Sequence, residues 1–373
     1  MRLSSWIVLA IAVTSLSACG GRRPHSVSTY SSNSPLTGQH SVGAPTADSS
    51  GQSTIQVDSL LAVDPEEQRQ AADSAADEAV LEELAEAHPE GDRDEAAPDE
   101  AEEEVPGGAN AAEAVTWDID VSTYNSHDRV QYYLDFFKGR GRERMGIWLN
   151  RLPRYEGMIR ERLARENLPG DLVYLALIES GFSNTATSRA KAVGMWQFMK
   201  RTAKGYGLRV DSWVDERRDP FKATDAAVRH LADLNRRFGS LYLAAAAYNA
   251  GSGKVSRGII RLPDDDSDTT NSDATFFRLY DTKLLRRETK DYVPKLIAAA
   301  LIAKEPRRYG FNVGEAEPAA YDSIVVPDMT GLDVIARLAD TTVAAIRELN
   351  PQYLRLATPP GSRSVIRLPV GRG

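Results

Sequence analysis

The sequence predicts a mainly α-helical protein with a small α+β domain at its C-terminus and a disordered tether near its N-terminus. Between residues 117 and 315, apolar residues recur at helical spacing and strand patterns are scarce. After residue 320, two short strand-like runs flank two helical patterns. Before residue 116, small, polar and acidic residues dominate. A chain of 373 residues fits two or three domains.

The first residues have the pattern of an export signal. Arg2 supplies positive charge, and residues 6–16 form an apolar run that is too short to cross a bilayer. Residues 1–18 are therefore predicted to be a signal peptide. Cys19 is the only cysteine, and it follows small residues as in a bacterial lipobox, so we expect its acylation to anchor the mature chain. A chance cysteine after an ordinary signal peptide is the alternative.

Residues 19–115 are predicted to form a disordered, acidic tether. Ser, Thr, Gly and Pro are abundant in residues 20–57. Residues 58–113 hold 20 acidic and 2 basic residues, so their net charge of −18 leaves +10 for the rest of a chain whose total is −8. A self-repelling linker, with at most a transient helix at 81–84, is the simplest interpretation. The charge difference also motivates the hypothesis that this arm folds back as a weak inhibitor.

Order is expected from Trp117 onward, in a helical domain spanning 116–316. Short helices are predicted near residues 130–137 and 147–152. Pro169 suits the first turn of a helix that runs through the apolar residues 172–178 to Glu179, and Gly181 stands where glycine ends helices. Further helices are predicted at 224–238, 241–248 and 289–303, with an exposed loop at 264–273.

Residues 317–373 are predicted to form a separate βααβ domain. Residues 321–326 and 365–369 read as strands, while 332–338 and 343–349 have helical spacing. A domain of about 50 residues is small but can fold by itself.

Glu179 is the leading candidate for acid/base chemistry. It follows seven largely apolar residues at the C-terminal end of the predicted helix. Apolar surroundings disfavour a charged carboxyl group, and so does the negative end of the helix dipole. Both effects raise the pKa of the carboxyl group, as a general acid near neutral pH requires. A solvent-exposed glutamate at a helix end is the alternative for this feature taken alone.

Three further segments carry polar side chains suited to a sugar-binding groove. Residues 194–199 combine glycine, Trp, Gln and two Met, and amides and indoles bind sugar hydroxyls and rings. Residues 247–253 end an apolar helix in Tyr-Asn before a glycine-rich turn. Residues 288–295 open a helix that places Tyr292 one turn after Glu288. Taken singly, a packed turn, an ordinary helix stop and a capped helix start remain open alternatives.

Together these residues resemble the lytic transglycosylase family, most closely the membrane-bound murein transglycosylase D group. The resemblance covers roughly residues 120–310 and implies a lysozyme-like helical catalytic domain. One departure is Lys191, which replaces a small residue of the family's pattern and puts subsite preference in doubt. The matching segments are Glu179-Ser180, Gly194 to Gln197, Ala247 to Gly251, the pairs Glu288-Thr289 and Tyr292-Val293, and the Asp215 to Pro220 stretch.

The resemblance also implies a mechanism with one catalytic glutamate and no cofactor or metal. Glu179 would cleave the β-1,4 bond between N-acetylmuramic acid and N-acetylglucosamine in peptidoglycan, leaving 1,6-anhydro ends. Tyr292 would hydrogen-bond near Glu179 or the substrate's acetamido group. The five histidines are scattered along the chain, which does not favour a metal site. The residues expected to line the groove are Ser180, Met195, Gln197, Tyr248 and Asn249.

The C-terminal domain resembles a divergent LysM domain, a family that binds N-acetylglucosamine-containing glycans. Residues 346–351 and 368–369 carry this weaker match, and a packing module without sugar affinity is the alternative. The expected location is the periplasm, with the lipid anchor in the outer membrane and peptidoglycan strands as the partner.

Two other functions are compatible with the sequence. One is a hydrolytic muramidase of the goose-lysozyme type, and the other is a non-catalytic peptidoglycan-binding lipoprotein. The basic excess of the folded part could suggest a nucleic-acid partner, but the export signal argues against it.

Overall fold

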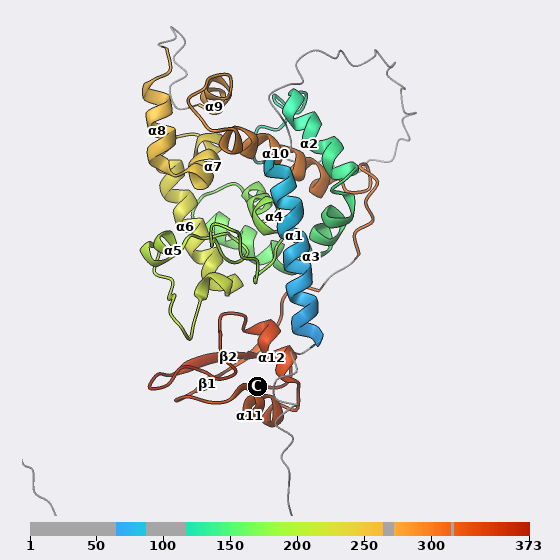
Figure 1. Ribbon diagram of the computed structural model, residues 1–373, viewed down its shortest axis with the longest axis vertical. Coiled ribbons are helices and arrows are strands. Elements are labelled where there is room, and N and C mark those ends of the chain that lie inside the picture. The colour runs from blue at the N-terminus through green and yellow to red at the C-terminus, as the bar shows by residue number, and fades with distance from the viewer. Residues whose placement is uncertain (1–64, 87–116, 264–271, 315–316) are drawn as a thin grey trace, which may run out of the picture. The chain divides into compact units, whose positions relative to one another are not determined.

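The computed structural model describes residues 65–86, 117–263, 272–314 and 317–373, and it is mainly helical as the sequence predicted (Figure 1). Cys19, the signal peptide and most of the tether lie outside these residues, as does most of the loop predicted at 264–273. Within the described part, no helix is both long enough and apolar enough to cross a membrane. The helices of the larger domain are α2 (Asp128–Lys138), α3 (Arg142–Arg165), α4 (Tyr174–Ser180), α5 (Lys200–Gly205), α6 (Pro220–Phe238), α7 (Leu241–Ala250), α8 (Ser252–Ile260), α9 (Asp273–Tyr280) and α10 (Arg287–Lys304).

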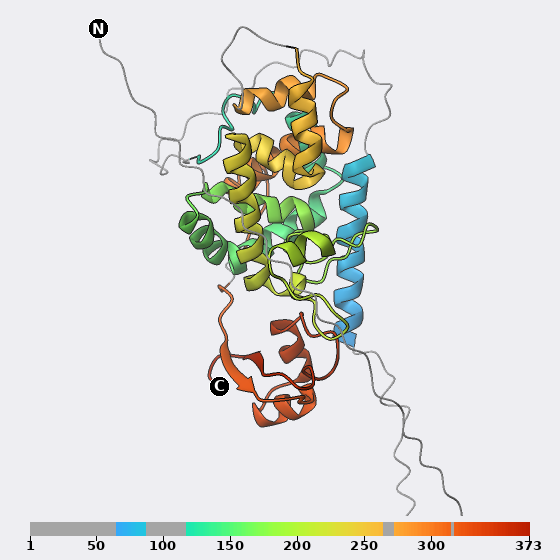
Figure 2. The ribbon, with the colours of Figure 1, turned by 90° about the vertical axis from the view of Figure 1, so that its left-hand side faces the viewer.

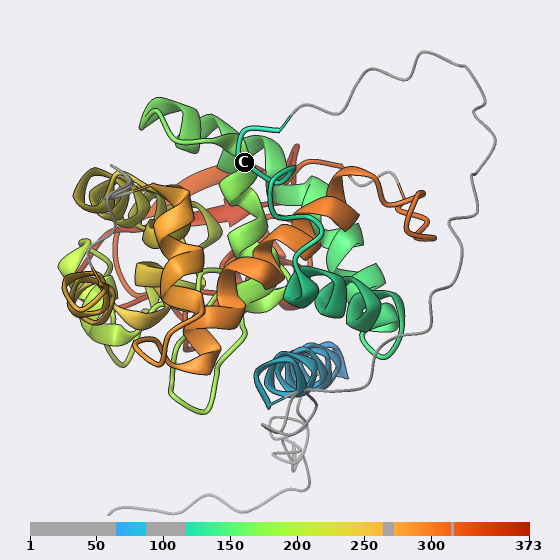
Figure 3. The same cartoon turned by 90° about the horizontal axis from the view of Figure 1, so that it is seen from above.

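Helix α10 is the central element of the larger domain, and it packs against α2, α4 and α7, as the view in Figure 3 shows. Its second half, residues 296–302, consists of Leu, Ile and Ala side chains that are all buried. A helix that is apolar on every side must be enclosed by others. The enclosure extends to the start of α10, where Tyr292 is 4% exposed.

Two helices differ in extent from the sequence prediction. The short helix predicted near 147–152 is the middle of α3, which has 24 residues, because Tyr155, Ile159 and Leu163 continue its apolar face beyond Pro153. The helix predicted to open at Pro169 starts as a 3-10 turn, Gly170–Val173, and becomes α-helical only at Tyr174.

Helix α4 ends at the glycine that the sequence singled out. Gly181 has φ = 56° and ψ = 38°, the left-handed conformation of a helix C-terminus. A Cβ atom here would come within 2.0 Å of the Trp148 ring. The close approach of Trp148 and the positive φ both require glycine, so the chain turns sharply just after Glu179 and Ser180.

The C-terminal domain has the predicted βααβ order. Strand β1 (Asp322–Val326) pairs antiparallel with β2 (Ser364–Leu368), in a register that sets Ile324 opposite Ile366. Helices α11 (Leu332–Leu338) and α12 (Val343–Leu349) lie between them in sequence. A separate small core of Leu332, Ile335, Ile346 and Ile366 holds this domain together, and Figure 2 shows its strands and helices (red) as one group.

A buried ion pair joins the C-terminal domain to the larger one. Arg367 of β2 donates through Nη2 to both carboxylate oxygens of Asp219, at 2.9 and 2.7 Å. Asp219 is 1% exposed, and it also accepts the backbone N–H groups of Phe221 and Lys222 at the start of α6. The Asp215 to Pro220 stretch, noted in the sequence only as a family pattern, is therefore a structural junction.

The prediction of a disordered tether is wrong for residues 65–86, which form the 22-residue helix α1 (Pro65–Glu86). The sequence did not predict this helix because it has few apolar residues, and the partners of its inward-facing side chains lie far away in sequence. Asp77 is fully buried and accepts from Trp148 Nε1 and Arg151 Nη1, each at 2.7 Å. Leu84, 1% exposed, joins the main core.

Candidate active site

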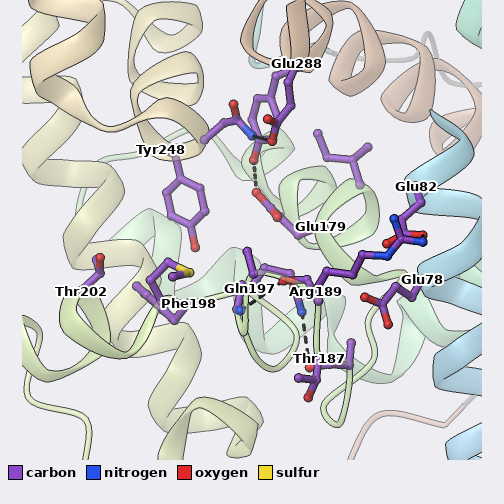
Figure 4. A pocket seen from close by; sticks show the side chains of 18 of the residues that line it. Glu78, Glu82, Glu179, Thr187, Arg189, Gln197, Phe198, Thr202, Tyr248 and Glu288 are labelled. Carbon is purple, nitrogen blue, oxygen red and sulfur yellow. Dashed lines mark hydrogen bonds and ion pairs between the residues drawn. The ribbon is translucent and has the colours of Figure 1, made fainter. Parts of the chain in front are cut away.

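A cavity of about 560 Å³ opens where α1, α4, α7, α10 and the 186–199 loop meet. Figure 4 shows the side chains that line it, with Glu179 between Tyr248 and the Arg189 side chain. The cavity brings together five of the residues that the sequence proposed. These are Glu179, Gln197, Tyr248, Asn249 and Tyr292.

The carboxyl group of Glu179 is enclosed by protein except where it meets the cavity. Tyr292 on α10 donates its hydroxyl hydrogen to Glu179 Oε1 at 2.6 Å, which Figure 4 marks as a dashed line. Burial raises the pKa of Glu179 from 4.5 to about 7. The Tyr292 hydrogen bond and the charge of Lys295 act in the opposite direction, while Glu288 adds to the rise. The raised pKa expected from the sequence is thus present, with burial as its main cause.

The 194–198 turn places an amide on the cavity wall. Gly194 has φ = +83°, and a Cβ atom there would lie 1.9 Å from the Arg217 carbonyl oxygen, so only glycine fits. Gln197 lines the cavity and donates through Nε2 to Gly194 O at 2.9 Å. Tyr248 anchors the same turn by donating its hydroxyl hydrogen to Trp196 O at 2.8 Å. These contacts fix the wall opposite Glu179.

Glu288 is a further carboxylate in the same cavity, and the sequence did not single it out as a partner for Glu179. Glu288 Oε1 accepts from Asn249 Nδ2 at 3.3 Å. Thr289 Oγ1 in turn donates to Asn249 Oδ1 at 3.2 Å. This short chain of hydrogen bonds joins the end of α7 to the start of α10 and orients the Asn249 amide.

Ser180 and Met195 are not where the sequence placed them. Both are 0% exposed, and Ser180 Oγ donates to Met195 O at 2.8 Å. Ser180 lies on the side of α4 that faces the interior, since its neighbour Glu179 takes the side that meets the cavity. The expectation that these two side chains line the groove is therefore wrong, and they join α4 to the 194–198 turn instead.

Lys191, the departure from the family's pattern, lies beside the cavity, because its neighbours Ala190 and Ala192 line it. The Lys191 side chain is exposed, with φ = 63°, and does not itself line the cavity, whereas Arg189 from the same stretch does. Lys295, three residues after Tyr292, lines it too and is 9% exposed. Helical spacing from Tyr292 could have revealed Lys295, whereas no sequence signal pointed to Arg189.

The geometry suits proton transfer between Glu179 and a bound substrate. A carboxyl group with a pKa of about 7 can donate a proton near neutral pH and take one back afterwards. His230 lines the same cavity, and burial lowers its pKa to about 4, so it is neutral at pH 7. Among the residues that the structure describes, no group of three or more His, Cys, Asp or Glu is placed to hold a metal ion. Fold and site define a helical domain with a buried carboxyl group of raised pKa in an open cavity, followed by a small βααβ domain.

Comparison with known proteins places both domains. Residues 157–269 match the transglycosylase SLT domain, and residues 320–373 match the LysM-like domain of lytic transglycosylase MltD. The chain therefore carries an SLT transglycosylase domain followed by an MltD-type LysM-like domain. The SLT match contains Glu179, Gln197, Tyr248 and Asn249, whereas Tyr292 lies beyond its end.

Two sequence relatives and one solved structure are similar to parts of this chain. The membrane-bound lytic murein transglycosylase D of Escherichia coli K12 is 32% identical over 198 residues, which are 52% of this chain and 42% of that protein. The chain thus spans less than half the length of this relative. The peptidoglycan transglycosylase gp16 of phage T7 is 40% identical over 104 residues, 27% of this chain and 8% of that protein. The solved structure of an inactive mutant of lytic transglycosylase Slt from Pseudomonas aeruginosa covers 40% of this chain and 24% of its own, at 23% identity and a TM-score of 0.32.

Proposed function

We propose that this protein is a peptidoglycan lytic transglycosylase that cleaves the β-1,4 bond between N-acetylmuramic acid and N-acetylglucosamine, leaves 1,6-anhydro ends and serves in cell-wall remodelling. The observation that carries this proposal is Glu179, whose carboxyl group has a pKa of about 7 and meets an open cavity. The SLT and LysM-like domains support the choice of peptidoglycan as substrate.

In the proposed reaction, Glu179 acts twice. It first gives its proton to the glycosidic oxygen, and the bond from that oxygen to C1 of the muramoyl residue breaks. The substrate's own N-acetyl group stabilises the positive charge at C1. The carboxylate of Glu179 then takes the proton of the muramoyl 6-hydroxyl group, whose oxygen bonds to C1. Glu179 ends the cycle protonated, and no water is consumed.

The surrounding side chains have supporting roles in this proposal. The Tyr292 hydrogen bond at 2.6 Å stabilises the carboxylate form of Glu179 between the two steps. Gln197 and Asn249 present amides to sugar hydroxyl groups from two sides of the cavity. Tyr248 completes the wall and holds the 194–198 turn in place.

Hydrolysis is the competing activity, and one observation favours it. Glu288 supplies a further carboxylate in the same cavity, and inverting glycosidases use a second carboxylate to activate water. Glu288 is already engaged by Asn249 Nδ2, which favours a structural role. The two activities differ in their products, because hydrolysis leaves reducing ends and transglycosylation leaves anhydro ends.

Product analysis decides between these activities. Purified sacculi treated with the protein should release muropeptides with 1,6-anhydro ends, detected by mass spectrometry as one water lighter than their reducing counterparts. Glu288→Gln should still form anhydro ends, at a rate within about tenfold of the unmodified protein, since it weakens one hydrogen bond. Reducing ends as the main product, lost in Glu288→Gln, would establish hydrolysis instead.

We also propose that Cys19 is acylated and anchors the protein to the periplasmic face of the outer membrane. Cys19 lies outside the described residues, and the support is its place after a short apolar run in the sequence. Cys19→Ser should move the protein from the membrane fraction to the soluble periplasmic fraction. Unchanged fractionation of Cys19→Ser would contradict the lipid anchor.

A further inference from the structure

One wall of the cavity is acidic and comes from helix α1, a segment outside the SLT match. Glu78 and Glu82 are one turn apart on α1, so they share a face. Both line the same cavity as Glu179. Figure 4 shows them on the right, opposite Tyr248 and beside the Arg189 side chain.

Helix α1 is held in place by contacts on its other faces. Asp77 is buried against Trp148 Nε1 and Arg151 Nη1 at 2.7 Å each. Glu83 forms an ion pair of 2.9 Å with Arg140, away from the cavity. Leu84 adds apolar contact in the main core. The cavity remains open with α1 docked, so α1 shapes the cavity rather than filling it.

Arg189 forms an ion pair with this acidic wall. Its Nη2 atom lies 2.5 Å from Glu82 Oε2, and its side chain is 76% exposed. Two carboxylates and one guanidinium group give this side of the cavity a charge of −1. Removing both carboxylates would change it to +1, and removing the guanidinium group would change it to −2.

The substrate of the proposed function carries charge on its peptide stems. Peptide stems attached to the glycan bear free carboxylates, whereas strands without stems are close to neutral. Charges within about 8 Å of each other interact even at physiological ionic strength, and a cleft concentrates such fields. A stem entering along α1 would meet Glu78 and Glu82 first.

We propose that Glu78, Glu82 and Arg189 determine specificity, disfavouring glycan strands with anionic peptide stems relative to strands without them. This inference rests on the proposed transglycosylase function and deepens it. It assigns α1 a role in substrate selection that differs from the inhibitory arm considered from the sequence. The charge of the wall, rather than its shape, is the property that selects.

The test compares kcat/KM for two forms of one substrate: solubilised peptidoglycan strands with their stems, and the same strands after an amidase has removed the stems. The double variant Glu78→Gln and Glu82→Gln should raise the ratio of stem-bearing to stem-free kcat/KM about fivefold at low salt. Arg189→Gln should change the ratio in the opposite direction. Both effects should shrink at about 1 M salt, where the screening length is near 3 Å.

Glu83→Gln is the matched control, because Glu83 lies on the same helix but pairs with Arg140 and does not line the cavity. Its ratio should equal that of the unmodified protein. Binding of each substrate to the Glu179→Gln forms of these variants gives a second readout that does not need turnover. An unchanged ratio in both the double variant and Arg189→Gln would overturn the inference. Absence of anhydro product from either substrate would instead overturn the proposed function.

Discussion

Glu179→Gln should lower the rate of glycan cleavage by roughly 10²–10⁴-fold, the usual contribution of a general acid. Glutamine has nearly the same shape and can still accept a hydrogen bond from the Tyr292 hydroxyl group, whose oxygen lies 2.6 Å from Glu179 Oε1. It cannot donate a proton to the glycosidic oxygen or take one from the 6-hydroxyl group. The measurement is the release of anhydro-muropeptides from purified sacculi. Retention of more than about a tenth of the activity would contradict the role proposed for Glu179.

The same variant should change how stability depends on pH, which provides an independent control on folding. Glu179 has a pKa of about 7 in the folded protein against 4.5 as its ordinary value. The folded state therefore binds the Glu179 proton more tightly than the unfolded state does. The stability that this proton contributes is fully present below pH 4.5 and is lost as pH rises through about 7.

The size of this effect follows from about 1.4 kcal/mol for each tenfold difference in proton affinity. The unmodified protein should lose roughly 3 kcal/mol of unfolding free energy across that range, and Glu179→Gln should not. At pH 8 the inactive variant should thus be the more stable of the two. Urea unfolding at several pH values measures the difference, and parallel pH profiles would mean that Glu179 has an ordinary pKa.

Asp219→Ala should destabilise the protein by roughly 3–5 kcal/mol, since it leaves the Arg367 guanidinium group buried without its carboxylate. The 1% exposure of Asp219 and the two hydrogen bonds at 2.9 and 2.7 Å make this pair well shielded from water. Loss of the α6 cap adds about 1 kcal/mol. Thermal or urea unfolding of the unmodified protein and the variant measures the total.

Two further variants separate the ion pair from the cap. Asp219→Asn keeps an oxygen that can accept the Phe221 and Lys222 N–H groups and removes only the charge. Its stability should therefore lie between that of the unmodified protein and that of Asp219→Ala. In a protein that already carries Arg367→Met, Asp219→Asn should lower the free energy of unfolding much less than it does when Arg367 is present, because no buried cation remains. Equal costs in both backgrounds would show that the pair does not couple the two domains.

The sequence alone determined the features that depend on neighbouring residues. Helix periodicity gave the helical class and the βααβ order, since one apolar face must be buried. Gly181 predicted the helix end because left-handed backbone favours glycine. The apolar run before Glu179 predicted a raised pKa, but the burial that raises it comes from the packing of distant segments around the cavity.

Only the tertiary structure decided which side chains meet. The hydrogen bond from Tyr292 to Glu179 spans 113 positions in sequence, and nothing local specifies such a partner. Ser180 and Met195 turned out to be internal, since the direction of a side chain depends on what packs around it. Helix α1 lacks a long apolar face, and its order comes from Trp148 and Arg151, which bind the buried Asp77. Patterns along the chain reflect local conformational preferences. The acidic wall and the place of Glu288 in the cavity instead depend on packing between distant segments.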